Sequence, residues 1–355
     1  MSTKSKTTNT LKQLDKRLLS EYITALVWSN QGKYLAIVTA AGELALWQQG
    51  NLEILTASHD YSLDCVGFSQ DGHYLATAGQ EGKVRIWQLG VNSPKFTLNT
   101  TLDQGNAWID SLAWHPQKNL LAFAVNRQVK VWDVDQGQLM AELNFADSSV
   151  FNIAWHPQGK FLAASGHGSV KVWNIENWSE PPEKLEVPGA SLDCAWSSHG
   201  DYLASGNLDR TISLLHWGNP SPWLMQGFPG KVSKVVWSNT SDPVLASSCQ
   251  DAVIVWEFSN EINNWQNRVL QHDQAIQAMT FAPNSFLLTS ASNDGGIQLW
   301  SKAKKLTKIV SGKIKFSGLA WNPTGDYLAA GGQNGEVIIF KNSISSSSRG
   351  FGRVR

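Results

Sequence analysis

Three residues of the types that a hydrolase uses lie close together in the sequence: His272, Ser290 and Asp294. A histidine that removes a proton from a serine, while an aspartate orients the imidazole, performs nucleophilic acyl transfer. The sequence has no G-x-S-x-G segment, which would expose a serine at a sharp turn. Trp300 follows closely, and a buried indole N–H needs an acceptor. We therefore expect His272, Ser290 and Asp294 to have a structural role, with no catalytic residues among them.

Other chemistries find even less support in the sequence. Asp64 and Asp110 would suit glycoside hydrolysis only at a defined separation, and they lie in different repeats. Cys65, Cys194 and Cys249 form no C-x-x-C pair of the kind that binds zinc. No phosphate-binding glycine motif is present. The sequence predicts no metal and no cofactor, and it places the histidines of four equivalent turns (His73, His115, His156 and His199) in solvent.

The composition excludes several classes of protein. The chain has 355 residues with 29 basic and 29 acidic side chains, so its formal net charge is zero. A dedicated nucleic-acid binder usually carries a basic excess, and a disordered chain has few aromatics. No apolar stretch approaches the length of a membrane span. The odd, unpaired cysteine count and the polar N-terminus predict a reducing, cytoplasmic location.

Tryptophan is abundant, and its spacing predicts the fold. There are 17 tryptophans. A first aromatic anchor recurs every 40 to 46 residues, at Trp28, Phe68, Trp114, Trp155, Trp196, Trp237, Phe281 and Trp321. A second anchor follows each one, at Trp47, Trp87, Trp132, Trp173, Leu215, Trp256, Trp300 and Phe340. A period of this length is typical of propeller blades.

Each repeat reads as three short strands and a variable fourth. Alternating apolar residues lead to the first anchor, a Pro/Gly-rich turn follows, and a run of small residues such as FLAAS comes next. A β-branched strand then ends at the second anchor. We number these eight repeats as units 1 to 8. Small residues suit the narrow part of a wedge-shaped blade.

This pattern resembles the WD-repeat (WD40) family of β-propellers over Leu18–Phe340, and the Trp-His-Pro turns are similar to those of bacterial members. The Trp-Asp dipeptide itself survives only at Trp132-Asp133. The resemblance implies an all-β fold, and the eight units predict an eight-bladed propeller. The alternative is seven blades plus an irregular module.

The family also implies a hydrogen-bond relay within a blade. It runs through a histidine before the first strand, a Ser or Thr on the second, an Asp in the next turn and the tryptophan of the third. Only unit 7 has all four residues: His272, Ser290, Asp294 and Trp300. Unit 2 has His59, Thr77 and Trp87, with Glu81 in place of the aspartate. We therefore expect packing, more than this relay, to hold most units.

The ends of the chain predict how the ring closes. Unit 8 lacks a fourth strand, and an unpaired edge is unfavourable. We expect Lys16–Tyr22 to pair with Glu336–Phe340; the alternative is a helix over Leu11–Leu19. We assign residues 11–342 to a single propeller, and residues 1–10 and the basic segment 343–355 to disordered tails.

The resemblance further implies where partners bind. The docking face bears the loops between units, and the residue four before each first anchor lies on its inner rim: Thr24, Asp64, Asp110, Phe151, Leu192 (or Asp193), Ser233, Gln277 and Ser317. We expect Asp64, Trp108, Asp110 and Phe151 to form one patch, with Gln277 also on this rim. Such a patch suits a partner that offers an apolar side chain beside Arg or Lys. The alternative is that these aromatics only fill the junctions between blades.

The predicted function is a non-catalytic scaffold that binds proteins or peptides, as a monomeric propeller within a complex. We expect no nucleic-acid partner and no membrane span. The alternative is an enzyme, or an accessory protein that handles a metal or ligand, using the central channel. Fold alone does not give function.

Overall fold

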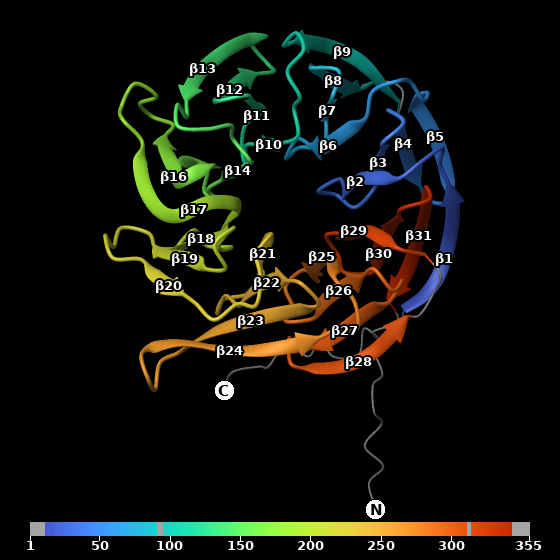
Figure 1. The fold of residues 1–355 in the computed structure, drawn as a ribbon. Helices are drawn as coiled ribbons and strands as arrows, with labels where there is room; N and C mark the ends of the chain where they lie inside the picture. The colour runs from blue at the N-terminus through green and yellow to red at the C-terminus, as the bar shows by residue number, and fades with distance from the viewer. Residues whose placement is uncertain (1–10, 91–94, 311–313, 343–355) are drawn as a thin grey trace, which may run out of the picture.

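The computed structural model describes residues 11–90, 95–310 and 314–342. All regular elements in these ranges are β-strands, which form antiparallel sheets arranged in a closed ring (Figure 1). The predicted all-β propeller is therefore confirmed. No helix within the described ranges is long and apolar enough to cross a membrane.

Each unit contributes its strands in order from the ring axis outward (Figure 1). The strands of units 1 to 3 are β2 (Ile23–Trp28), β3 (Leu35–Thr39), β4 (Leu44–Gln48), β5 (Asn51–Thr56), β6 (Leu63–Phe68), β7 (Tyr74–Gly79), β8 (Lys83–Leu89), β9 (Phe96–Asp103), β10 (Leu112–Trp114), β11 (Leu120–Val125), β12 (Gln128–Asp133) and β13 (Gln138–Asn144). The strands of units 4 and 5 are β14 (Asn152–Trp155), β15 (Phe161–Ser165), β16 (His167–Asn174), β17 (Glu183–Trp196), β18 (Tyr202–Asn207), β19 (Ile212–His216) and β20 (Trp223–Met225). The strands of units 6 to 8 are β21 (Lys234–Trp237), β22 (Leu245–Cys249), β23 (Ala252–Ser259), β24 (Asn264–Gln271), β25 (Ile276–Phe281), β26 (Leu288–Ser292), β27 (Ile297–Ser301), β28 (Lys305–Val310), β29 (Phe316–Trp321), β30 (Tyr327–Gly332) and β31 (Glu336–Asn342).

Strand β17 is unusual because it belongs to two units. Its first part pairs with β16 of unit 4, and its second part pairs with β18 of unit 5. Pro188, which has no N–H to donate, and Gly189, whose φ of +76° favours glycine, lie opposite the register shift in the pairing with β16, just before Ala190, the last residue that pairs with β16. The described strands therefore form seven sheets, six of four strands and one of seven. The predicted count of eight blades depends on whether the seven-stranded sheet is one blade or two.

The ring closes through an N-terminal strand, β1 (Leu11–Leu18), which pairs antiparallel with β31. The sequence placed this strand later, at Lys16–Tyr22. The strand ends earlier because the Leu19 N–H donates to Gly335 O and Ser20 bonds to Glu43, which turns the chain toward β2. Beyond unit 8, β1 also reaches unit 1, since Trp47 Nε1 donates to Asp15 Oδ2 at 2.7 Å and Arg17 donates to Gly50 O.

The core lies between neighbouring sheets. For example, Trp28 and Ile37 of unit 1 pack against Ala329 and Ile339 of unit 8. The second strand of a unit contributes small, fully buried side chains such as Ala163 and Ala164. Small side chains let the sheets approach closely, which a ring of wedge-shaped blades requires.

The first-anchor tryptophans also join adjacent sheets by hydrogen bonds, a role that their spacing did not reveal. Four of their indole N–H groups donate to the carbonyl just before the anchor of the preceding unit: Trp28 to Ala320 (3.1 Å), Trp114 to Gly67 (2.8 Å), Trp155 to Ala113 (2.9 Å) and Trp237 to Ala195 (3.0 Å). Each bond satisfies a donor that burial would otherwise leave unpaired. The other two differ: Trp321 Nε1 donates to Thr289 Oγ1 at 3.0 Å, and the buried Nε1 of Trp196 has no partner.

The histidines of the Trp-His-Pro turns correct one prediction. His73 and His199 are exposed as expected, but His115 and His156 are buried, at 1% and 5% exposure. His115 Nδ1 accepts the N–H groups of Gln117 and Lys118, and its Nε2 lies 3.0 Å from Gly159 O of the next unit. These imidazoles therefore cap their own turns and reach the neighbouring unit. Burial lowers the pKa of both histidines.

Candidate partner-binding site

Within the described ranges, one face of the ring carries the connections that lead from the outer strand of a unit to the innermost strand of the next. Because the strands of each unit are antiparallel, the turns between its second and third strands lie on the same face. We call this the upper face and the opposite one the lower face. The predicted partner-binding residues all belong to the upper-face connections or to the strand ends beside them.

Trp108 is the most exposed aromatic residue of this face. It lies in the connection between units 2 and 3, and 57% of its surface is accessible. Its indole Nε1 donates to Asp64 Oδ2 at 2.7 Å, and the Ser62 hydroxyl donates to the same oxygen at 2.8 Å. These bonds fix the edge of the indole and leave its ring in solvent. A fixed, exposed aromatic ring loses little conformational freedom when it binds a partner.

Asp110 lies two residues after Trp108 and is exposed. Partial burial of its carboxyl and the nearby charge of Asp64 raise the pKa of Asp110, and Lys234 of unit 6 opposes this effect. The pKa of Cys65 is raised mainly by burial, and the negative charges of Asp64 and Asp110 raise it further. Asp64 and Trp108 are therefore in direct contact, and Asp110 follows Trp108 by two residues.

Phe151 and Gln277 occupy different positions on the face. Phe151 lies in the next connection, between units 3 and 4, and is 40% exposed. Gln277 is the second residue of β25, the innermost strand of unit 7, on another part of the ring (Figure 1). It is half-buried, and its amide donates to Ile276 O at 3.4 Å. Phe151 thus extends the Trp108 region, whereas Gln277 stands apart from it.

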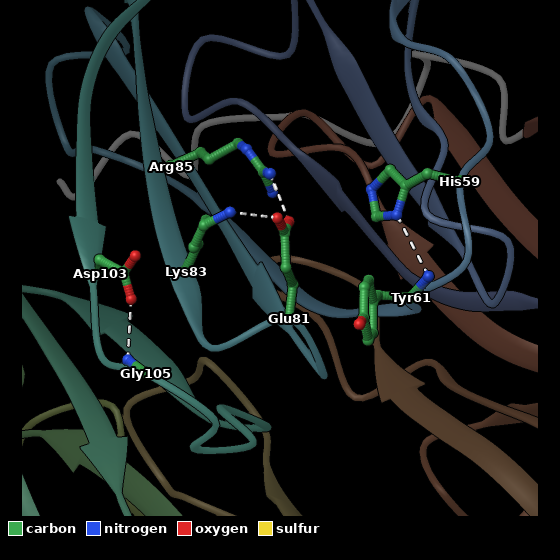
Figure 2. Close-up of polar contacts among 7 residues, drawn as sticks. All are labelled: His59, Tyr61, Glu81, Lys83, Arg85, Asp103 and Gly105. Carbon is green, nitrogen blue, oxygen red and sulfur yellow. Dashed lines mark hydrogen bonds and ion pairs between the residues drawn. The ribbon is translucent and has the colours of Figure 1, made fainter.

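Tyr61, in the connection between units 1 and 2, is a residue that the sequence reasoning missed. It is 51% exposed, and its N–H donates to His59 Nδ1 at 3.2 Å (Figure 2). Near it, Glu81 accepts from both Lys83 and Arg85 (Figure 2). An aromatic residue in a connecting loop, outside the anchor spacing, was the signal available in the sequence.

The exposed aromatic residues of the described chain are confined to this region. Among the described residues, the Phe, Tyr and Trp side chains in the exposed class are Tyr61, Trp108 and Phe151. They lie in three consecutive connections, which lead into units 2, 3 and 4. We call these three residues the aromatic band. Their loops are adjacent in the ring, because the innermost strands β6, β10 and β14 follow one another around its axis (Figure 1).

Other rim positions join neighbouring units and are not presented to solvent. The Thr24 hydroxyl bonds to Leu63 O of the next unit, and the Ser317 hydroxyl donates to Ile23 O at 2.6 Å. Asp193 is 4% exposed; it accepts from the Asn152 amide and from the Val235 N–H, the latter at 3.0 Å. Burial raises the pKa of Asp193, and Lys234 opposes the rise.

In unit 7 the four predicted relay residues are connected through Ser290 and Ser292. Trp300 Nε1 donates to Ser290 Oγ at 2.8 Å, and Ser290 Oγ lies 2.7 Å from His272 Nε2. His272 Nδ1 lies 2.9 Å from Ser292 Oγ, which donates to Asp294 Oδ1 at 2.7 Å. Ser292, which the sequence reasoning did not include, links the histidine to the aspartate. The donors balance for a neutral imidazole with its proton on Nδ1, in agreement with the pKa of His272, which burial lowers.

Unit 2 does not form the corresponding relay. Trp87 Nε1 is 3.4 Å from Thr77 Oγ1. His59 turns toward the preceding unit, where its ring packs against Gly42, and its buried Nε2 has no hydrogen-bond partner. Glu81 is paired with Lys83 and Arg85. The substitution of Glu for Asp thus coincides with loss of the relay.

Metal and thiol chemistry gain no support from the geometry. Within the described ranges, no group of three or more His, Cys, Asp or Glu side chains is arranged to hold a metal ion. Cys65, Cys194 and Cys249 are all free and buried, and burial raises the pKa of each thiol. A raised thiol pKa opposes formation of the reactive thiolate.

Comparison with known proteins identifies the repeat. The profile described as "WD domain, G-beta repeat" matches residues 50–88, 96–133, 137–174, 186–215, 265–301 and 305–341, which is more than half of the chain. The crystal structure of Sqt1 from Chaetomium thermophilum is similar in fold, with a TM-score of 0.82 and 17% sequence identity, covering 94% of this chain and 99% of that chain.

Two curated proteins resemble parts of the sequence. Protein transport protein SEC13 homolog A of Arabidopsis thaliana is 30% identical over 126 residues, which cover 31% of this chain and 41% of that protein. Nuclear distribution protein nudF 1 of Talaromyces marneffei is 30% identical over 101 residues, which cover 27% of this chain and 21% of that protein. The matched segments thus span less than half of either relative.

Proposed function

Because this chain belongs to the WD40 repeat family, we propose that it is a non-catalytic scaffold whose upper face binds a partner protein or peptide. The observation that carries the proposal is the aromatic band, Tyr61, Trp108 and Phe151. Burying a large aromatic side chain contributes much of the energy of a protein interface, and tryptophan and tyrosine are enriched among hot-spot residues. Three such residues on adjacent loops are suited to receive a partner.

The arrangement of Trp108 favours binding over a purely structural role. A tryptophan that only filled a junction between units would have a buried ring. In Trp108 the polar edge is bonded to Asp64 and the ring is 57% exposed. The names of the two curated relatives refer to protein transport and nuclear distribution, not to a chemical reaction. The structural role of the His272 relay agrees with a scaffold that lacks a catalytic centre.

We also infer that the ring has eight blades. The seven-stranded sheet contains two first strands, two second strands and two third strands, and β17 changes partner from β16 of unit 4 to β18 of unit 5 between Ala190 and Ser191. Counted in this way, each unit is one blade. The three free cysteines suit a reducing compartment, so we place the protein in the cytoplasm, as a monomeric propeller within a larger complex.

The experiment compares three tagged proteins as baits in lysate of the source cells: the wild type, Trp108→Ala and Leu98→Ala. Leu98 is the matched control, because it is 50% exposed but lies on the outer strand β9 and not on the upper face. Proteins recovered specifically on the wild type are quantified by mass spectrometry.

Loss of a hot-spot residue costs about 2 kcal/mol or more, which is roughly thirtyfold in affinity. We expect Trp108→Ala to lose the specific partner and Leu98→Ala to retain it, with both variants folded by circular dichroism. Equal recovery by Trp108→Ala and the wild type would move the binding surface away from the aromatic band.

A further inference from the structure

The charges around the aromatic band are unevenly compensated. In units 2 and 3 the upper face carries Lys83 and Arg85, but both cations are bound to Glu81 (Figure 2). Arg127, in the second-to-third-strand turn of unit 3, donates to Ala146 O at 3.4 Å. Lys83 and Arg85 are therefore neutralised by Glu81, whereas Arg127 is exposed and has only this backbone contact among the described residues.

Four carboxylates of the same region are left without an ion pair among the described residues: Asp60, Asp64, Asp103 and Asp110. Asp103 accepts the Gly105 N–H at 2.8 Å (Figure 2), and Asp64 accepts from Trp108 and Ser62. The negative charge of Asp64 raises the pKa of Asp110, which follows Trp108 by two residues. A chain that is neutral as a whole thus concentrates negative charge beside an exposed indole ring.

Lys234 lies across the ring axis from this region, and its positive charge lowers the pKa of Asp110. It begins β21 of unit 6 (Figure 1), and its Nζ lies 3.9 Å from Asp193 Oδ1. The Lys234 side chain is 63% exposed, whereas that of Asp193 is 6% exposed and has other donors. The ammonium is thus held loosely by one carboxylate, while its charge also reaches Asp110.

We propose that the partner presents a Lys or Arg side chain that binds between Asp64 and Asp110 against the ring of Trp108, with apolar neighbours that pack on Tyr61 and Phe151. This inference rests on the proposed function and specifies the chemistry of its partner. A cation over an indole ring is attracted by the ring and by both carboxylates. Lys234 repels the incoming cation and competes with it for the same negative charge, so it weakens binding in the free protein.

The test is selection from a random dodecapeptide library displayed on phage. The wild type, the double variant Asp64→Asn/Asp110→Asn and Trp108→Ala are used as separate targets. A matched control, Asp251→Asn/Asp273→Asn, removes two carboxylates from the upper-face segments of units 6 and 7. Circular dichroism melting confirms that each target is folded, and the affinity of one selected peptide is then measured by fluorescence anisotropy.

We expect peptides selected on the wild type and on the matched control to combine Arg or Lys with Leu, Ile or an aromatic residue. The Asp64→Asn/Asp110→Asn target should lose the Arg and Lys enrichment and bind the selected peptide about tenfold or more weakly. Lys234→Met should bind it about twofold to fivefold more tightly, as expected for removal of an exposed charge.

The outcomes separate this inference from the proposed function. Neutral or acidic peptides that require Trp108 would overturn the cationic partner and leave the docking surface in place, as would equal enrichment on the wild type and on Asp64→Asn/Asp110→Asn. Peptides that bind the wild type and Trp108→Ala equally, or no enrichment above the empty support, would contradict the docking surface itself.

Discussion

Units 2 and 7 have related motif residues and use them in opposite ways. In unit 7, His272 is 2% exposed, and each of its ring nitrogens lies within hydrogen-bond distance of a serine hydroxyl. In unit 2, His59 turns to the preceding unit and its Nε2 has no partner. The connection into unit 2 exposes Tyr61, whereas no aromatic side chain is exposed in the connection into unit 7. In unit 7 the complete relay thus accompanies a connection with no exposed aromatic side chain. In unit 2 the incomplete relay accompanies a connection that exposes an aromatic ring.

The difference can be traced to two residues of units 1 and 2. Asp294 is short enough to accept from Ser292 and from the Gly296 N–H of its own turn, both at 2.7 Å. Glu81 is longer and accepts from Lys83 and Arg85. Gly42 has a φ of +77°, and a Cβ there would lie 2.5 Å from the His59 ring. Glycine therefore makes room for the turned imidazole, and Glu81 takes no part in holding it.

Opening the ring should cause the largest loss of stability, because units 2 and 7 both depend on a closed ring. Removal of residues 1–22 deletes β1 and exposes the edge of β31. It also removes the buried side chains of Leu11 and Leu19. We expect a loss of more than about 3 kcal/mol in the free energy of unfolding, seen as a marked fall in the melting temperature. An unchanged melting curve would show that β1 does not stabilise the ring.

Two matched histidine substitutions should destabilise the protein by different amounts, because only unit 7 has a complete relay. His272→Ala leaves Ser290 and Ser292 without their imidazole partner, which costs about 1–3 kcal/mol. His59→Ala removes one exposed hydrogen bond, from the Tyr61 N–H, and a ring whose Nε2 is already unpartnered, so its effect should be smaller, within about 1 kcal/mol. Urea unfolding measures both values. Equal losses for the two variants would contradict the assignment of a working relay to unit 7 alone.

The fold could largely be predicted from the sequence, because anchors and turns recur in every unit. The all-β ring and the position of the eight units follow from local patterns of side-chain type. The strand β1 was placed too far along the chain, because the point at which it ends depends on bonds to Gly335 and Glu43, which are distant in the sequence. The burial of His115 was missed for the same reason, since its Nε2 meets Gly159 of the next unit.

The candidate site was predictable only in part. The spacing before the anchors placed Asp64, Trp108 and Asp110 in one region, where the structure shows a hydrogen bond between two of them. It could not distinguish Thr24 and Ser317, whose hydroxyls bond to neighbouring strands, from residues that face solvent. Tyr61 was missed because the direction of a loop side chain is set by the loops around it. Whether these residues bind a partner remains a prediction.

A change of pH should test the buried histidines of both faces. Burial lowers the pKa of His115, His156 and His272, so the folded protein keeps them neutral. Below the unfolded value of about 6.5 the unfolded chain binds more protons than the folded one. Their contribution to stability is therefore complete above pH 6.5 and is lost as the pH falls below it.

The matched variant for this prediction is His115→Ser/His156→Ser, because Ser29 and Ser69 cap the equivalent turns of units 1 and 2 through their hydroxyl groups. Between pH 7.5 and 5.5 the wild type should lose more stability than this variant, as measured by urea unfolding at both values. A variant with the same pH dependence as the wild type would show that these two imidazoles do not titrate with unfolding.

The smallest effect on stability is expected for Tyr61→Ala. The side chain is 51% exposed, so its loss should change the free energy of unfolding by no more than about 0.5 kcal/mol. If the aromatic band binds a partner, the same variant should weaken that binding without lowering the melting temperature. A clear loss of stability would instead assign Tyr61 a role in packing.

The most direct test of the account is amide hydrogen exchange of the wild type with and without the partner that it captures. The connections that contain Tyr61, Trp108 and Phe151 should become protected when the partner binds, while the turn that contains Asp294 and the lower-face turns at His115 and His156 exchange as before. Protection confined to the lower face, or to units 6 and 7, would contradict the claim that the aromatic band is the docking surface.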